Sequence, residues 1–252
     1  MSNLTIGVGV CALTFLFGYA GMWAQKLLPE AHMTSGAREM IGAVMGLIAL
    51  LLALVLGTLV GSAYGFYATQ KANVEVMAAR SIQLDMALRP FGAEATMIRA
   101  GLSASINQAY KAIWIDHLDP SQYDINTLVA NFNQLNAAVA ALKPTTPEQN
   151  AAISTINVSV GIIEQTRLLM SLQLASPISW PLLFVVVSWA MLLFAGYGVL
   201  ARLNGTAVAA ALIGGFAIGS AVFLILELNQ PFLGLFRLPA AAMQQAMAVL
   251  GK

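Results

Sequence analysis

Four long stretches without a charged side chain determine what this chain can fold into. Residues 1–25, 40–70, 168–201 and 203–226 contain no Lys, Arg, Asp or Glu. Each stretch is longer than the roughly 20 residues that a helix needs to cross a hydrocarbon core of about 30 Å. Charged residues make up 9% of the chain, against about 25% in an ordinary soluble domain. The sequence therefore predicts a polytopic membrane protein with four transmembrane helices.

The distribution of charge predicts how these helices are organised. Residues 1–70 form one transmembrane hairpin and residues 168–228 form a second. The segment between them, 71–167, carries most of the charge and is expected to be an aqueous, cytoplasmic domain. Its apolar residues recur three and four positions apart, as in Ile98, Leu102 and Ile106, which is the helical period. Residues 229–252 remain as a C-terminal tail, so the predicted fold class is all-α.

Local signals predict where the aqueous helices begin and end. The second span is expected to continue as a helix through residues 71–89. Thr146 followed by Pro147 is typical of a helix N-terminus, with a hydroxyl cap and proline in the first turn. That helix is expected to run through Arg167 toward Pro177 and enter the third span directly. Residues 119–121 predict a break.

Small residues follow one face of the second span. Gly57, Gly61 and Gly65 form a tandem GxxxG pattern, which lets neighbouring helices approach closely in lipid. The contact is either packing within one subunit or packing of subunits around a symmetry axis. Residues 215–221 of the fourth span repeat the glycine spacing of residues 57–63, which indicates a shared packing requirement or a duplicated hairpin.

Two hydroxyl residues and one aromatic residue lie beside this glycine pattern. Thr58, Ser62 and Phe66 are candidate pore-lining residues, because hydroxyls can replace hydration partners and a large apolar side chain can gate by dewetting. The simpler interpretation is that the hydroxyls bond back to the preceding helical turn.

Glu227 ends the fourth span, where its charge is unfavourable to the helix dipole and to lipid. We expect it to form a structural ion pair with Arg167, Arg80 or Arg89 on the aqueous helices. A structural role is favoured over a permeation site.

Other chemistry has little support in the sequence. Asp116, His117, Asp119 and Asp124 lack the spacing of a calcium loop, and no zinc motif is present, so no metal site is predicted. Motifs for nucleophilic catalysis or nucleotide binding are also missing, so neither enzymatic activity nor a cofactor is expected. A net charge of +1 gives no field that would attract nucleic acid.

The C-terminal motif resembles that of a known family. Residues 224–237, LILELNQPFLGLFR, are similar to the signature of the bacterial bestrophin-like family, long catalogued as a domain of unknown function. Shorter similarities occur at residues 61–64, 84–88, 92–95 and 165–167. Asn229 and Leu233 depart from the family's usual acidic or polar residues. The resemblance implies a homopentameric channel in the bacterial inner membrane, with the second span lining the pore and the intervening helices in the cytoplasm.

Two functions from different classes follow from these observations. The first is a homo-oligomeric, pentameric channel for small inorganic ions, of undetermined selectivity because no charged ring lies within the spans. The alternative is a membrane-anchored scaffold or sensor whose helical insert binds a partner. It is supported by the lack of charged groups that most transporters need inside the membrane.

Overall fold

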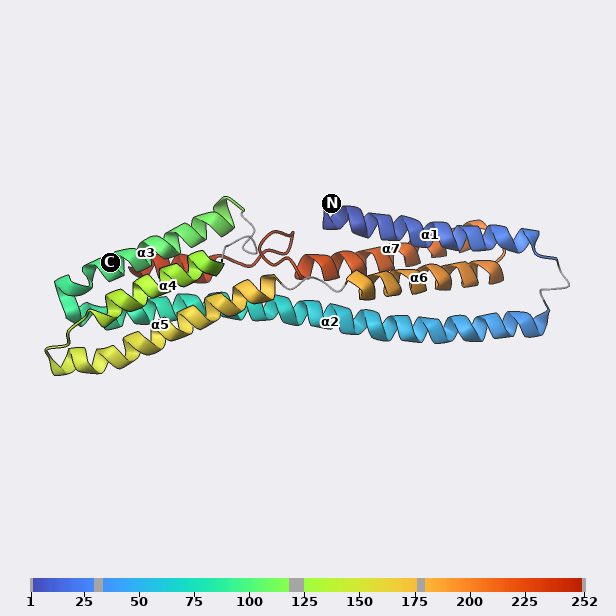
Figure 1. Cartoon of the computed structure of the whole chain (residues 1–252). Helices are drawn as coiled ribbons and strands as arrows, with labels where there is room; N and C mark the ends of the chain where they lie inside the picture. The colour runs from blue at the N-terminus through green and yellow to red at the C-terminus, as the bar shows by residue number, and fades with distance from the viewer. Residues whose placement is uncertain (1, 30–33, 118–124, 176–179, 251–252) are drawn as a thin grey trace. The chain divides into compact units, whose positions relative to one another are not determined.

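The computed structural model describes residues 2–29, 34–117, 125–175 and 180–250, and these residues are almost entirely helical. Among them, four helices are long and apolar enough to cross a membrane: α1, α2, α6 and α7. The predicted all-α membrane fold is confirmed. In chain order (Figure 1), the elements are α1 (Asn3–Leu27), α2 (Ser35–Leu88), a 3₁₀ segment η2 (Arg89–Ala95), α3 (Thr96–Tyr110), a π-helical turn η3 (Lys111–Ile115), α4 (Ile125–Ala140), α5 (Pro147–Leu174), α6 (Trp180–Leu200), α7 (Gly205–Leu228) and α8 (Ala241–Leu250).

The chain forms two compact units. The first contains α1, the N-terminal part of α2 as far as Phe66, α6 and α7. The second contains the rest of α2 from Tyr67, the elements from η2 to α5, and the C-terminal segment from Gln230 with α8. Helix α2 is continuous from Ser35 to Leu88, as predicted for the second span, and so belongs to both units.

Glycine determines how α1 packs in the first unit. A Cβ on Gly219 of α7 would lie 2.6 Å from the carbonyl oxygen of Gly7 and 2.8 Å from the Cβ of Cys11. A Cβ on Gly21 would overlap the backbone of Ala195 in α6. Helix α1 therefore fits closely against both α6 and α7 because these positions lack side chains.

Helix α2 contacts α6 through larger apolar side chains. Leu52 is buried against Val186, Ala190 and Leu193 of α6. Met45 approaches so closely that a Cβ on Gly196 would overlap its side chain. One face of α2 thus packs against α6 of the same subunit.

The second unit has a conventional hydrophobic core. Buried side chains from α2, η2, α3, α4, α5 and α8 form it, together with Leu142 after α4 and with Phe232 and Leu238 from the segment between α7 and α8. The indole Nε1 of Trp114 donates to the carbonyl oxygen of Leu238 at 2.9 Å, and the rings of Trp114 and Phe232 meet edge to face. The C-terminal segment is therefore part of this core.

The helix boundaries agree with some local predictions and refine others. Thr146 caps α5 in a capping box with Gln149, and Pro147 is the first helical residue, as predicted. Helix α5 ends at Leu174 and α6 begins at Trp180, so the uncharged stretch 168–201 divides between a helix of the second unit and a helix of the first. Pro177 and the break predicted at residues 119–121 lie outside the described residues.

Candidate functional site

The glycines predicted to pack helices lie on the uncovered side of α2. Among the described residues, a Cβ placed on Gly57, Gly61 or Gly65 meets no atom within 4 Å beyond the adjoining backbone of α2 itself. The similar glycines of α7, Gly215 and Gly219, are in tight contact with α1. The glycine pattern of α7 is thus a helix contact within the subunit, whereas the glycine pattern of α2 is exposed.

Thr58 and Ser62 share this uncovered side, whereas Phe66 is half-buried. The Thr58 hydroxyl donates to the carbonyl oxygen of Val55 at 2.8 Å, the local bond that is common for hydroxyls in membrane helices. Because its proton is used within the helix, the lone pairs of the Thr58 oxygen remain available to accept hydrogen bonds from outside.

The uncovered side of α2 changes character along its length. Toward its N-terminal end, α2 presents large apolar side chains on this side, and between Gly57 and Gly65 it presents glycines and hydroxyls. The leucines are Leu47, Leu50, Leu51 and Leu54, each at least 40% exposed. If this side of α2 lines a water-filled pore in an assembly, an ion would pass a hydrophobic section and then a section whose polar groups can replace its hydration water.

Glu227, at the end of α7, is buried with 5% of its surface exposed. The side-chain amide of Asn3 donates to its Oε1 at 3.0 Å, so the first turn of α1 contributes to its surroundings. Arg80 donates to Gln83, and the guanidinium of Arg167 lies 5.7 Å from the centre of the Phe132 ring. The ion pair of Glu227 with Arg167 or Arg80 remains a prediction.

Two variants separate the charge of Glu227 from its hydrogen bond. Glu227→Gln keeps an oxygen that can accept from Asn3 but removes the charge, whereas Asn3→Ala removes the amide donor and leaves the charge of Glu227 in place. If an arginine holds the carboxylate, Glu227→Gln should lower the thermal midpoint more than Asn3→Ala, since the arginine is left uncompensated. Equal midpoints for the two variants would argue against the ion pair.

A charge centre that sequence reasoning did not assign lies in the second unit. Asp85 is fully buried on α2, and Arg99 of α3 approaches both of its oxygens, with Nε 2.6 Å from Oδ1 and Nη2 3.2 Å from Oδ2. Arg89, one turn after Asp85, also donates to Oδ2 at 3.2 Å. The hydrogen bond to Asp85 raises the pKa of Arg99 above its ordinary value, with a further rise from the carboxylate charge and partial opposition from desolvation. In the sequence, the local sign of this centre is an acidic residue, Asp85, placed directly after Leu84 and three positions before Leu88 in an otherwise apolar segment.

This charge centre fixes a reversal of the chain. Gly92, between α2 and α3, has φ of 56°, a left-handed conformation that side chains disfavour. The Asp85 contacts with Arg99 join the two helices on either side of that turn. The cluster is structural, and its residues all belong to the second unit.

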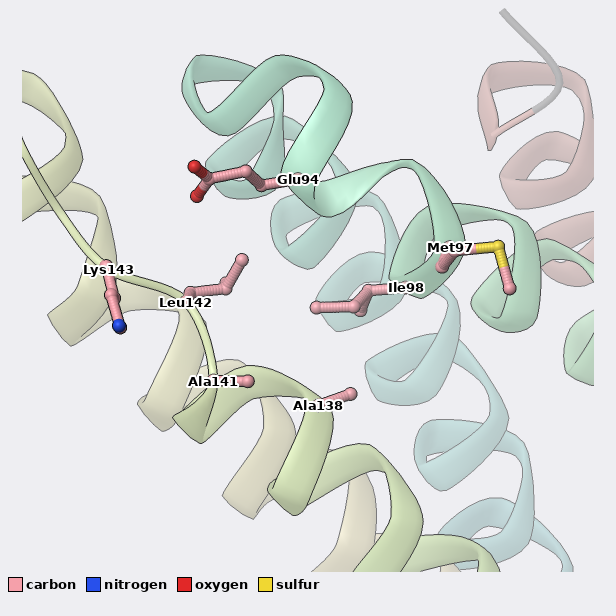
Figure 2. A pocket seen from close by; sticks show the side chains of 7 residues that line it. All are labelled: Glu94, Met97, Ile98, Ala138, Ala141, Leu142 and Lys143. Carbon is pink, nitrogen blue, oxygen red and sulfur yellow. The ribbon is translucent and has the colours of Figure 1, made fainter.

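A hollow of about 410 Å³ lies beside the same turn (Figure 2). Its walls are mostly apolar, and the charged side chains of Glu94 and Lys143 lie at one side. The lining residues are Glu94, Met97, Ile98, Ala138, Ala141, Leu142 and Lys143. These groups include no nucleophile with a neighbouring base, so the hollow offers no catalytic arrangement.

The candidate metal cluster is only partly described. Asp116 and His117 are exposed, and His117 lies within hydrogen-bonding distance of Arg237, whereas Asp119 and Asp124 lie outside the described residues. Within the described part of the chain, no three His, Cys, Asp or Glu side chains are grouped so as to hold a metal ion.

The whole arrangement has known relatives. The sequence model of the Bestrophin-like domain matches residues 12–243. The chain belongs to the bestrophin-like family. The resemblance found in its C-terminal motif is therefore confirmed, and the family and fold imply an integral membrane protein that acts as an ion channel.

Solved structures share the fold at low sequence identity. A substituted form of a bacterial bestrophin homologue from Klebsiella pneumoniae is 13% identical with a TM-score of 0.70, over 98% of this chain and 99% of that one. A second substituted form of the Klebsiella protein is 13% identical with a TM-score of 0.62, over 97% of each chain. A membrane protein with a single substitution is 12% identical with a TM-score of 0.68, over 97% of each chain. No curated protein matches the chain.

Proposed function

We propose that this bestrophin-like chain forms a homo-oligomeric, pentameric ion channel in the bacterial inner membrane, with α2 lining the pore. The observation that carries this proposal is the uncovered face of α2. A Cβ at Gly57, Gly61 or Gly65 would meet no neighbouring element among the described residues, although small residues in membrane helices ordinarily permit close contact. Copies arranged around an axis would use this face for packing and for the lumen.

Within that pore, Thr58 and Ser62 would contact the permeating ion or its water, with Phe66 near the edge of the exposed face. Leu54, which is 65% exposed, is large and apolar enough to contribute to a dewetting gate. Residues 40–70 contain no charged side chain. We therefore propose no selectivity for anions or cations from this helix.

A matched pair of serines tests whether α2 faces water. Ser62 and Ser220 both occur in a Gly-Ser-Ala sequence and are exposed in the subunit, but Ser220 lies on α7. In a Cys11→Ala background, Ser62→Cys should react with a water-soluble thiol reagent and lose most of its single-channel conductance when a bulky adduct fills the lumen. Ser220→Cys should conduct unchanged after the same treatment.

The outcomes of this experiment also separate the rival function. Equal insensitivity of the two cysteine variants in a conducting protein would place the pore elsewhere. A purified protein that forms no conductance in planar bilayers but binds a soluble partner through its helical insert would favour a membrane scaffold or sensor.

A further inference from the structure

The hollow beside the turn at Gly92 is bordered by two charges of opposite sign. Glu94 belongs to η2 and Lys143 follows α4, so two separate parts of the chain bring these side chains to the hollow. Both are exposed, and within the described part of the chain neither side chain has a hydrogen-bond or ion-pair partner. They lie at the same side of the hollow (Figure 2). The hollow therefore has one carboxylate and one ammonium group available to a ligand.

The rest of the lining is aliphatic. Ile98 and Leu142 are 7% and 8% exposed, because they also belong to the core of the second unit. Ala138 and Ala141 have only a methyl group each, which leaves the space in front of them open. Met97 is 83% exposed and has an unbranched side chain that can adapt to a bound molecule. The volume of about 410 Å³ lies within the range of about 300 to 1,000 Å³ that is typical of small-molecule sites.

The two charges restrict the kind of ligand that fits. A ligand with a carboxylate alone would be attracted by Lys143 and repelled by Glu94, and a ligand with an amine alone would meet the reverse. A ligand with both groups would pair with each side chain through charge-assisted hydrogen bonds, which are stronger than neutral ones. Its apolar part must be small, because a hollow of about 410 Å³ does not hold the two acyl chains of a zwitterionic lipid.

We propose that this hollow binds a free aliphatic amino acid such as leucine. The ammonium group of the ligand pairs with Glu94 and its carboxylate pairs with Lys143. Its branched side chain lies against Ile98 and Leu142, where it removes apolar surface from water. The bound ligand joins η2 and α3 to the segment that follows α4. All of these residues belong to the second unit, so the site is complete in one subunit and does not depend on the proposed pore.

Titration of the full chain with leucine, followed by saturation-transfer NMR of the ligand, tests this site. The chain is held in nanodiscs of phosphatidylglycerol, a lipid without an ammonium group that would compete for Glu94. Wild type should show saturable binding at millimolar leucine. Glu94→Gln and Lys143→Gln should each raise the dissociation constant at least about tenfold, the size of one lost charge-assisted hydrogen bond. Glu148→Gln removes an exposed carboxylate that does not line the hollow, and it should bind leucine as wild type does.

Two ligand analogues and a filled hollow separate the class of ligand from its place. Isocaproate lacks the ammonium group and isoamylamine lacks the carboxylate, so each should bind at least about tenfold more weakly than leucine. Ala141→Phe places a ring in the hollow from an exposed position, and it should abolish leucine binding while the thermal midpoint stays that of wild type. A wild type that does not bind leucine, or an Ala141→Phe variant that binds it equally well, would refute the site. Isocaproate binding as tight as that of leucine would refute the pairing with Glu94 and with it the class of ligand.

Discussion

Replacing Asp85 with alanine is expected to destabilise the second unit strongly. The carboxylate is buried and accepts hydrogen bonds from both Arg89 and Arg99, so its removal leaves two guanidinium groups without compensation. Removing one partner of a fully buried pair costs roughly 3 to 5 kcal/mol. The loss here should be smaller, because the side chains of Arg89 and Arg99 retain 49% and 30% exposure and can recover some hydration.

The control for this variant lies on the same helix. Lys71 and Glu75 form an exposed pair at 3.9 Å with the same spacing as Asp85 and Arg89, and such pairs contribute about 0 to 1 kcal/mol. Thermal unfolding in detergent should therefore show a decrease on the order of 5 °C or more for Asp85→Ala and little change for Glu75→Ala. Similar midpoints for the two variants would show that the charge centre does not hold the turn at Gly92.

The transmembrane part of the fold could be predicted because its physical cause is local. A stretch without charge that is long enough to cross the bilayer can be recognised directly, and the capping residue Thr146 marks a helix start. The stretch 168–201 shows the limit of this reasoning. Residues 168–174 are uncharged, yet they belong to α5, and α6 begins only at Trp180. Absence of charge alone therefore does not show where one helix ends and the span begins.

The use of each glycine pattern could not be predicted, since it depends on which helix lies opposite. Gly61 and Gly219 occur in the same Gly-Ser-Ala sequence. Helix α1 packs on Gly219, whereas no described residue of another element lies against Gly61. The charge centre was similarly hidden. Asp85 and Arg99 are 14 residues apart, and only the reversal at Gly92 brings them together.

The two glycines are expected to respond to substitution in opposite ways. Gly219→Ala adds a Cβ 2.6 Å from the carbonyl oxygen of Gly7, a backbone atom that can move only if α1 separates from α7. Overpacking of this kind typically costs 1 to 3 kcal/mol, and a leucine at the same position should prevent the first unit from packing. Gly61→Leu meets open space, so the folded subunit should keep the wild-type thermal midpoint.

Assembly is where Gly61→Leu should act. A leucine at position 61 of α2 would hold neighbouring helices apart, because close approach is what a small residue permits in lipid. Cross-linking and light scattering should show a weakened oligomer of otherwise folded subunits for Gly61→Leu, whereas Gly219→Leu should yield poorly folded protein at any concentration. If Gly61→Leu retains the wild-type mass and cross-linking pattern, the glycines of α2 are not a subunit contact, and the small face must serve the lumen alone.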